Sequence, residues 1–213
     1  MDWAARRKGR GPEFLTADGK MNLEATILED RFVRLEPLGE AHREALRAAC
    51  AADREVWTAL YPYSLEGAHF DPGWVRMYAR PDPARISFAV VAGGVCQGVT
   101  SYLAIDPVNA TVEIGGTYIA PGVRGGAVNP AAKRLLLGDA FARGARRVSF
   151  RVDALNARSR AAVLKLGALQ EAILRRDRVT WTGRVRDTVV FSVIAEEWPD
   201  VQAGLDARLA KYD

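Results

Sequence analysis

Cysteine and histidine are scarce in this sequence. Its 213 residues include two of each. Cys50 and Cys96 lack the spacing of metal ligands and do not suggest a disulfide framework. His42 and His69 are too few for a histidine-rich metal site. We therefore expect no bound metal ion and a protein of a reducing compartment, which by default is the cytoplasm.

Long hydrophobic runs and clustered positive charge are missing as well. No apolar segment reaches the length of a membrane span. The first residues also lack the pattern of a signal peptide, in which a charged region is followed by an apolar region and a cleavage site of small residues. The net charge is +4, and residues 1–20, with five basic and three acidic side chains, carry half of it. Residues 21–213 are therefore too weakly basic for a nucleic-acid surface. We expect neither a membrane nor a nucleic acid as partner, and the charge is compatible with one small polyanion.

The composition predicts one globular domain. Hydrophobic residues make up 49% and charged residues 26% of a chain that is long enough to bury a core. Residues 1–20 show no periodicity and precede a second methionine, Met21, so we interpret them as an expression leader or a disordered arm. The domain is expected to span residues 21–213.

The pattern of hydrophobic residues predicts an α/β fold of the α+β type. Gly93-Gly94 marks a hairpin within three consecutive strands between residues 86 and 119, which should form an antiparallel meander. A helix at 130–143 joins the last of these strands to the next one, and such a βαβ connection makes the two strands parallel. The sheet should thus be mixed and mostly antiparallel, with one parallel unit and flanking helices. Strands are expected at 31–37, 86–91, 95–105, 111–119, 147–153, 169–179 and 186–194, and helices at 40–52, 72–78, 130–143, 157–166 and 196–211.

A glycine-rich turn at residues 119–130 links the strand at 111–119 to the following helix. Asn129 is expected to cap this helix through its side-chain oxygen, Pro130 suits the first helical position, and Gly144 should end the helix. Such a turn aims main-chain N–H groups and a positive helix end at one point, which attracts phosphate. The pattern alone leaves two interpretations open: a cradle for a phosphorylated cofactor, or an ordinary strand-to-helix turn.

Several motifs in order resemble the GCN5-related N-acetyltransferase (GNAT) superfamily, and together they cover about residues 24–200. Val112-Glu-Ile-Gly-Gly-Thr-Tyr-Ile119 resembles its central strand, and Arg124-Gly-Gly-Ala-Val-Asn129 resembles its acetyl-CoA pyrophosphate loop. Asp153-Ala-Leu-Asn-Ala-Arg-Ser159 is similar to its second cofactor motif. Arg186–Ser192, followed by Glu197-Trp198-Pro199, resembles the ending of the RimJ/RimL-like branch. The resemblance implies a single GNAT-like domain that moves the acetyl group of acetyl-CoA to a primary amine.

The resemblance also implies where the cofactor binds. The loop departs from the family pattern, because Gly122 stands where glutamine or arginine is usual. Arg124 could replace that contact to a phosphate, or it is a solvated loop arginine. Asn156 would bond the pantetheine arm, cap the helix at 157–166, or do both, and Arg158 would meet a phosphate or lie on the surface. The implied cofactor-binding residues are Tyr118, Ile119, Arg124, Gly125, Gly126, Ala127, Val128, Asn129, Asn156 and Arg158.

Glu113 is the candidate general base that takes a proton from the amine. It is the only acid in an otherwise apolar strand, and burial there would raise its pKa toward neutrality. The alternative is an outward-facing strand carboxylate. Gly115-Gly116 predicts a bulge that exposes a main-chain N–H near Thr117 or Tyr118 for the thioester oxygen, unless the glycines merely relieve crowding.

The leaving thiolate must be stabilised or protonated. Many family members place a tyrosine seven residues after the motif asparagine as general acid, and here that position is Val163. We expect Ser159 to bind or protonate the thiolate in its place, with a first-turn helix serine as the alternative. The missing tyrosine also favours a rival hypothesis, a catalytically idle acyl-CoA-binding regulatory domain, which the presence of Glu113 opposes.

The acceptor amine is left open by the sequence. The aromatic residues Trp57, Tyr61, Tyr63 and Trp74 would cover the acceptor pocket or pack into the core. A peptide or protein N-terminus, a free amino acid, a polyamine and an aminoglycoside all stay possible, and the RimJ/RimL-like resemblance favours N-termini. A nucleotide-binding phosphate loop is disfavoured, because the turn lacks its Lys-Ser/Thr pair. We expect a monomer or a homodimer.

Overall fold

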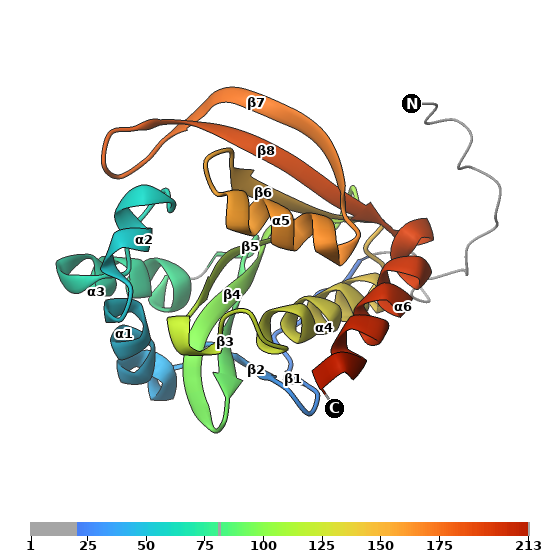
Figure 1. Ribbon diagram of the computed structural model, residues 1–213, viewed down its shortest axis with the longest axis horizontal. Coiled ribbons are helices and arrows are strands. Elements are labelled where there is room, and N and C mark those ends of the chain that lie inside the picture. The colour runs from blue at the N-terminus through green and yellow to red at the C-terminus, as the bar shows by residue number, and fades with distance from the viewer. Residues whose placement is uncertain (1–20, 81, 213) are drawn as a thin grey trace.

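One mixed sheet organises the chain. The computed structural model describes residues 21–80 and 82–212, so the predicted leader at residues 1–20 lies outside the described residues. The sheet has eight strands in the order β1-β2-β3-β4-β5-β6-β8-β7 (Figure 1). Its neighbouring pairs are antiparallel except β5 and β6, which run parallel as predicted. The strands are β1 (Leu28–Glu29), β2 (Arg34–Pro37), β3 (Ile86–Ala92), β4 (Val95–Asp106), β5 (Thr111–Ile119), β6 (Arg147–Asp153), β7 (Leu169–Val179) and β8 (Val185–Ile194).

Six α-helices flank this sheet in the described part of the chain. The helix predicted at 157–166 is confirmed as α5, whereas the one predicted at 72–78 begins earlier and continues as a π-helical turn, Val75–Ala79. α2 has no predicted counterpart, because residues 53–60 show no helical period. None of the described helices is long and apolar enough to cross a membrane. The helices are α1 (Arg43–Ala51), α2 (Arg54–Ala59), α3 (Phe70–Trp74), α4 (Val128–Ala142), α5 (Ala157–Leu166) and α6 (Trp198–Leu209).

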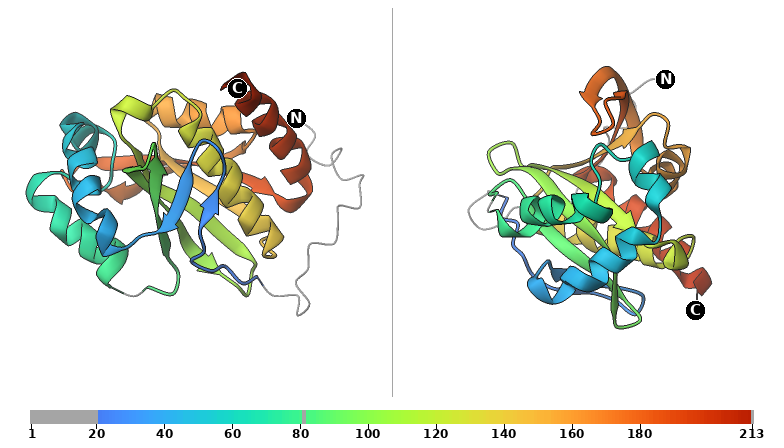
Figure 2. Two further views of the ribbon diagram at one scale, coloured as in Figure 1. Left: turned by 90° about the horizontal axis from the view of Figure 1, so that it is seen from below. Right: turned by 90° about the vertical axis from the view of Figure 1, so that its left-hand side faces the viewer.

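The sheet carries a separate hydrophobic core on each face. Leu136, Leu137 and Phe141 of α4 belong to one core, which also includes residues of β5, β6, β8 and α6. Trp57 and Phe70 belong to the other, formed with α1, α2 and α3. Figures 1 and 2 show α1–α3 grouped at one end of the molecule, away from α4 and α6. Strand β5 lies between the two cores and contributes side chains to both.

A bulge in β5 reverses its side-chain alternation. Val112 and Ile114 face the α4 core, and regular alternation would place Tyr118 with them. Tyr118 instead belongs to the opposite core, because the pairing with β4 gains one residue on β5 between Gly115 and Tyr118. Gly116 adopts the left-handed conformation, with φ of +59°. The predicted bulge at the glycine pair is therefore confirmed.

Helix α4 begins earlier than predicted. Its first residue is Val128, with Ala127 at the cap position, and no side chain caps it. The predicted cap by Asn129 is therefore wrong: Asn129 is the second residue of the helix, and Pro130 is the third. The chain already turns at Gly125, whose φ is +81°, and proline is tolerated throughout the first helical turn, where N–H groups have no intrahelical acceptor. Gly144 follows the end of the helix as predicted, with φ of +89°.

The β7–β8 hairpin reaches across the molecule and docks on the aromatic segment. Trp181, at its tip, donates its indole N–H to the carbonyl of Trp57 at 2.9 Å and its main-chain N–H to the carbonyl of Pro62 at 3.1 Å. Arg184 adds a bond to the carbonyl of Ala59 at 3.3 Å. The hairpin and residues 57–62 thus form one wall, which covers the sheet next to β5 and β6.

Candidate active site

A cleft of about 580 Å³ opens where β5 and β6 separate. The two parallel strands pair only from Thr111 to Glu113 and from Arg147 to Ser149, although both continue further. Beyond that point, residues from both strands line the cleft, together with α4, α5, residues 60–63 and the β7–β8 hairpin. Ten of the predicted site residues line it: Glu113, Thr117, Ile119, Arg124, Gly125, Gly126, Asn129, Asn156, Arg158 and Ser159.

The other three predicted residues do not line the cleft; they are Tyr118, Ala127 and Val128. Tyr118 is fully buried, and its hydroxyl donates to the carbonyl of Ala49 at 2.6 Å. Ala127 and Val128 form the start of α4. Their predicted contribution came from main-chain groups and from the helix end, and it stays a prediction.

The β5 bulge places two residues without a strand partner at the centre of the cleft. Gly116 and Thr117 have no partner residue on β4, and the pairing with β6 has already ended. The Thr117 carbonyl is fixed by the hydroxyl of Tyr61 at 2.6 Å. A Cβ at Gly115 would lie 2.6 Å from a Glu113 carboxylate oxygen and 2.9 Å from Leu103 Cδ1, so a larger residue here would push these flexible side-chain ends aside. The glycine pair therefore forms the predicted bulge, and at Gly115 it also relieves crowding against the Glu113 side chain.

The loop before α4 presents free N–H groups to the same cleft. Among the described residues, the main-chain N–H groups of Gly125, Gly126 and Ala127 donate to no acceptor. The first N–H groups of α4, from Val128 onward, add the positive end of a helix. A Cβ at Gly125 or Gly126 would meet nothing within 4 Å, so the loop faces open space. This arrangement fits a diphosphate, which accepts hydrogen bonds from several N–H groups at once.

Arg124 is folded back onto its own loop. Its Nε donates to the carbonyl of Ile119 at 2.6 Å, its Nη1 pairs with the carboxylate of Asp53, and its guanidinium lies 5.3 Å from the ring of Tyr118. The interpretation of Arg124 as a solvated loop arginine is therefore wrong. Contact with a phosphate stays a prediction, in which Arg124 would have to share its charge with Asp53.

The second predicted motif lies on the α5 side of the cleft. Asn156 caps α5, because its side-chain oxygen accepts the N–H of Ser159 at 2.9 Å. The amide nitrogen of Asn156 has no acceptor among the described residues, so this side chain can cap the helix and also donate into the cleft. Ser159 is half-buried in the first turn of α5, and Val163 is buried one turn further along the same wall. Arg158 is exposed at the cleft rim.

Glu113 lies in the cleft on the face of β5 opposite to Val112 and Ile114. Within the described residues, no hydrogen bond or ion pair joins its carboxylate to another side chain. Burial raises the pKa of this carboxylate, although the charges of Arg151 and Arg178 act in the opposite direction. The prediction of a raised pKa is thus supported by the structure, and the outward-facing alternative is not.

Lys133 is a cleft residue that the sequence analysis missed. It is buried, with 6% of its surface exposed, and its Nζ donates to the Thr117 hydroxyl at 2.6 Å and to the Thr100 hydroxyl at 3.2 Å. Burial lowers its pKa to about 7. A signal was present: Lys133 shares a helical stripe with Leu136, Leu137 and other buried residues, and a lysine in an apolar stripe is unusual.

The aromatic residues divide between core and cleft. Trp57 and Trp74 are buried in the core beneath α1–α3, so they do not cover a pocket. Tyr61 and Tyr63 line the cleft as predicted. Tyr61 also positions the bulge through its bond to the Thr117 carbonyl.

The mixed sheet with its two diverging parallel strands, and the loop of free N–H groups before α4, define a class of protein, the acyl-CoA-dependent transferases. Comparison with protein families matches residues 33–169 to the acetyltransferase (GNAT) domain. The chain therefore belongs to the GNAT family, and it is an acetyl-CoA-dependent N-acetyltransferase. No curated protein matches the sequence significantly.

Solved structures agree with this assignment. A candidate acetyltransferase of T. thermophilus is 37% identical and has a TM-score of 0.78, with 89% of this chain and 100% of the other covered. A GCN5-related N-acetyltransferase from Brucella melitensis is 32% identical with a TM-score of 0.83, covering 91% and 89%. RimL, the ribosomal L7/L12 α-N-protein acetyltransferase in complex with coenzyme A, shares the fold at 16% identity and a TM-score of 0.68, covering 79% and 98%. The resemblance to the RimJ/RimL-like branch is confirmed at the level of the fold.

Proposed function

We propose that the protein acetylates the α-amine of a peptide or protein N-terminus. The observation that carries the proposal is the cleft in which three features follow one another along the chain: the half-buried carboxylate of Glu113, the β5 bulge, and the loop Gly125–Ala127 with its free N–H groups, here called the free-amide loop. The fold is shared with RimL, which acts on a protein α-amine. An α-amine titrates at about 7.7–8.0, so part of it is neutral at physiological pH, whereas a lysine side chain titrates near about 10.4. Transfer to an α-amine therefore needs less proton removal by a base than transfer to a lysine side chain.

The cofactor-binding half has residues suited to the phosphates and to the pantetheine arm of acetyl-CoA. The N–H groups from Gly125 to Val128 would hold the diphosphate, and the free amide of Asn156 would bond the pantetheine arm. Arg158 at the rim would meet a phosphate. When bound, acetyl-CoA supplies an acetyl group activated as a thioester. Ile119, the last residue of β5, lines the cleft just before this loop.

The reacting half depends on Glu113 and the bulge. The Glu113 carboxylate would accept a proton from the amine, directly or through a water, and its raised pKa suits a base that works near neutral pH. The main-chain N–H groups at Gly116 and Thr117 would donate to a carbonyl oxygen as it gains negative charge. Because Tyr61 fixes the Thr117 carbonyl, these groups are held in place before substrate binds.

Two residues would replace the absent tyrosine at Val163. Ser159 lines the cleft and can donate its hydroxyl proton. Lys133 lies beside Thr117 on the α4 side, and in its protonated form it would supply a positive charge close to the bulge, where a thiolate would be stabilised. A pKa of about 7 lets Lys133 give up a proton near neutral pH.

The test is transfer to defined amines. The full chain would be incubated with acetyl-CoA and with peptides whose α-amine is free, blocked, or free with an internal lysine; spermidine and an aminoglycoside complete the panel. Released coenzyme A would be measured with a thiol reagent, and the acetylated position by fragmentation mass spectrometry. We expect acetylation at the α-amine and none on the blocked peptides. Acetylation confined to lysine side chains or to polyamines would refute the proposal.

A further inference from the structure

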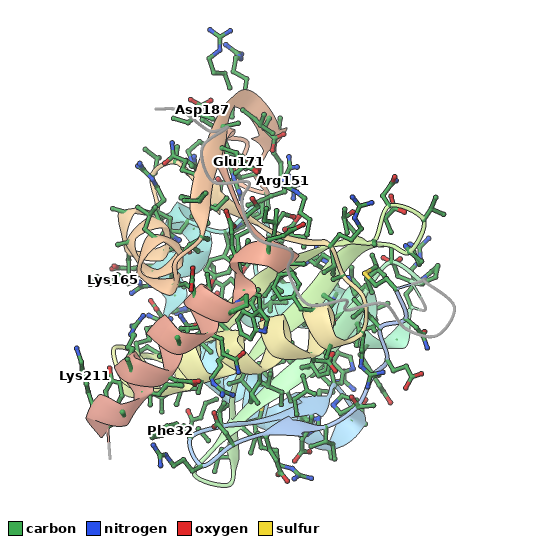
Figure 3. All side chains as sticks on the ribbon, turned by 90° about the vertical axis from the view of Figure 1, so that its right-hand side faces the viewer. Phe32, Arg151, Lys165, Glu171, Asp187 and Lys211 are labelled. Atoms are coloured by element: carbon green, nitrogen blue, oxygen red, sulfur yellow. The ribbon has the colours of Figure 1, made fainter. Side chains whose placement is uncertain are left out.

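The Glu113 end of the cleft is rich in arginine. Five arginines line it: Arg76, Arg85, Arg151, Arg178 and Arg186. They come from five separate segments, namely the π-helical turn, the loop before β3, and the strands β6, β7 and β8. Figure 3 shows Arg151 beside the β7–β8 hairpin, which also carries Glu171 and Asp187. Few acids face them, since Glu113 and Asp153 are the acidic residues that line the cleft.

Two of these arginines already have acidic partners. Arg151 pairs with Asp177 at 3.0 Å. Arg186 lies 3.8 Å from Asp153, a carboxylate that also pairs with Arg184. Their charges are therefore largely compensated within the protein.

The other three arginines have no carboxylate partner among the described residues. The Arg76 guanidinium lies over the ring of Tyr63, 4.1 Å from its centroid, and forms no ion pair. Arg85 and Arg178 have no ion pair either, yet both are close enough to lower the pKa of Glu113. Arg85 and Arg178 thus lie near Glu113 without an ion pair, although Arg178 also acts on the carboxylate of Asp177, and Arg76 adds a third charge beside Tyr63.

These arginines are placed for the acceptor and not for the cofactor phosphates. The free-amide loop begins beyond Ile119, six residues along β5 from Glu113, which is roughly 20 Å at the rise of a strand. The loop has its own N–H groups and helix end for the diphosphate. The charge at the Glu113 end therefore fits a second anion, and that anion must belong to the acceptor.

We propose that the acceptor is a primary amine that carries anionic groups, namely a peptide N-terminus followed by acidic side chains. The inference rests on the proposed function and deepens it. Arg76, Arg85 and Arg178 would bind the carboxylates of the second and third residues, because guanidinium groups form paired, charge-assisted bonds with carboxylates. Glu113 would face the α-amine. A polyamine or an aminoglycoside would bring more positive charge to this pocket, so these acceptors are disfavoured.

The experiment compares three peptides that differ only at positions two and three, with Glu-Glu, Gln-Gln or Lys-Lys after an N-terminal serine. We expect kcat/KM in the order Glu-Glu, Gln-Gln, Lys-Lys, with steps of about tenfold, since a hydrogen bond to a charged group supports a change of that size. The preference should weaken at high salt. Equal kcat/KM for the three peptides would overturn the inference while transfer to the α-amine, and with it the proposed function, still stands.

Variants then assign the preference to the arginines. Arg178→Gln and Arg76→Gln should raise KM about tenfold more for the Glu-Glu peptide than for the Gln-Gln peptide. Arg175→Gln is the matched control, because Arg175 is an exposed arginine of β7 that does not line the cleft. Arg178→Glu should shift the preference toward the Lys-Lys peptide, which a merely structural role would not do. If Arg178→Gln affects all three peptides equally, the arginine does not read acidic side chains.

A small anionic amine is the other source of the same chemistry. Aspartate, glutamate and an amino-sugar phosphate would be assayed beside the peptides. Turnover of these compounds without turnover of any peptide would support the anion-binding role of the arginines and refute the peptide acceptor, so failure of the two proposals can be told apart.

Discussion

Replacing Lys133 with methionine should stabilise the protein in a pH-dependent way. In the folded protein, burial lowers the pKa of Lys133 from 10.5 to about 7. Between these two pH values the unfolded chain binds the proton and the folded chain does not, so stability rises with pH. The cost of burying the lysine is therefore complete below pH 7 and disappears above pH 10.5. Each pH unit within this window is worth about 1.4 kcal/mol, so the cost falls by roughly 2 kcal/mol between pH 7 and pH 9.

Methionine fits this site for a structural reason. Its length is similar to that of lysine, and it leaves no new unpaired acceptor, because the hydroxyls of Thr100 and Thr117 already bond each other at 2.8 Å. Lys133→Met should thus gain stability relative to wild type at pH 7 and lose roughly 2 kcal/mol of that advantage by pH 9. Turnover should fall in the same variant, if Lys133 supports the leaving thiolate.

The assay is urea unfolding of wild type and variant at both pH values, followed by circular dichroism. Only the difference between the two proteins is used, so the titration of other groups cancels. Lys211→Met is the control, because Lys211 is exposed near the C-terminal end (Figure 3) and should show the same pH dependence as wild type. An equal difference between Lys133→Met and wild type at pH 7 and pH 9 would refute the argument, since it would mean that Lys133 keeps its ordinary pKa when folded.

Other substitutions test the remaining parts of the site. Glu113→Gln should lower kcat by about 10²-fold or more with little change in cofactor affinity, because general base catalysis contributes that much; titration of the variant with coenzyme A separates the two effects. The raised pKa of Glu113 also predicts that wild-type kcat/KM falls as the pH drops through that pKa, and that this limb is absent in Glu113→Gln; equal activity of the two proteins at every pH would exclude Glu113 as the base. Gly115→Ala should reduce kcat without unfolding the protein, because its methyl group would lie 2.6 Å from a Glu113 oxygen and displace that flexible side chain; a variant with wild-type kcat would show that the position of Glu113 is not critical.

The sequence predicts those features that local patterns encode. The parallel pairing of β5 and β6 follows from the helix between them, and the bulge follows from two glycines inside an apolar strand. The cap by Asn156 is confirmed, and it was predictable because asparagine is among the preferred N-cap residues. The same reasoning fails for Asn129: a helix can start at any of several positions after a glycine turn, and the turn at Gly125 started it two residues earlier.

Features assembled from distant segments could not be predicted in this way. The arginines around Glu113 come from five segments, and each arginine in isolation reads as a surface residue. Lys133 appears as an ordinary helical lysine until the helix packs against the bulge and brings Thr117 to it. Tyr61 fixes a carbonyl 56 residues further along the chain. Such contacts depend on tertiary packing, which no local pattern records.

Binding of the diphosphate by the free-amide loop is tested most directly by titration calorimetry with coenzyme A. Wild type should release heat on binding, and Gly125→Trp should not, because an indole at this position would occupy the open space in front of the loop. Gly125 has φ of +81°, so the substitution also strains the loop, and thermal unfolding of the variant must first show that the fold is retained. We predict loss of binding with a cooperative unfolding transition still present. A correctly folded wild-type protein that shows no heat and no competition with acetyl-CoA would contradict it.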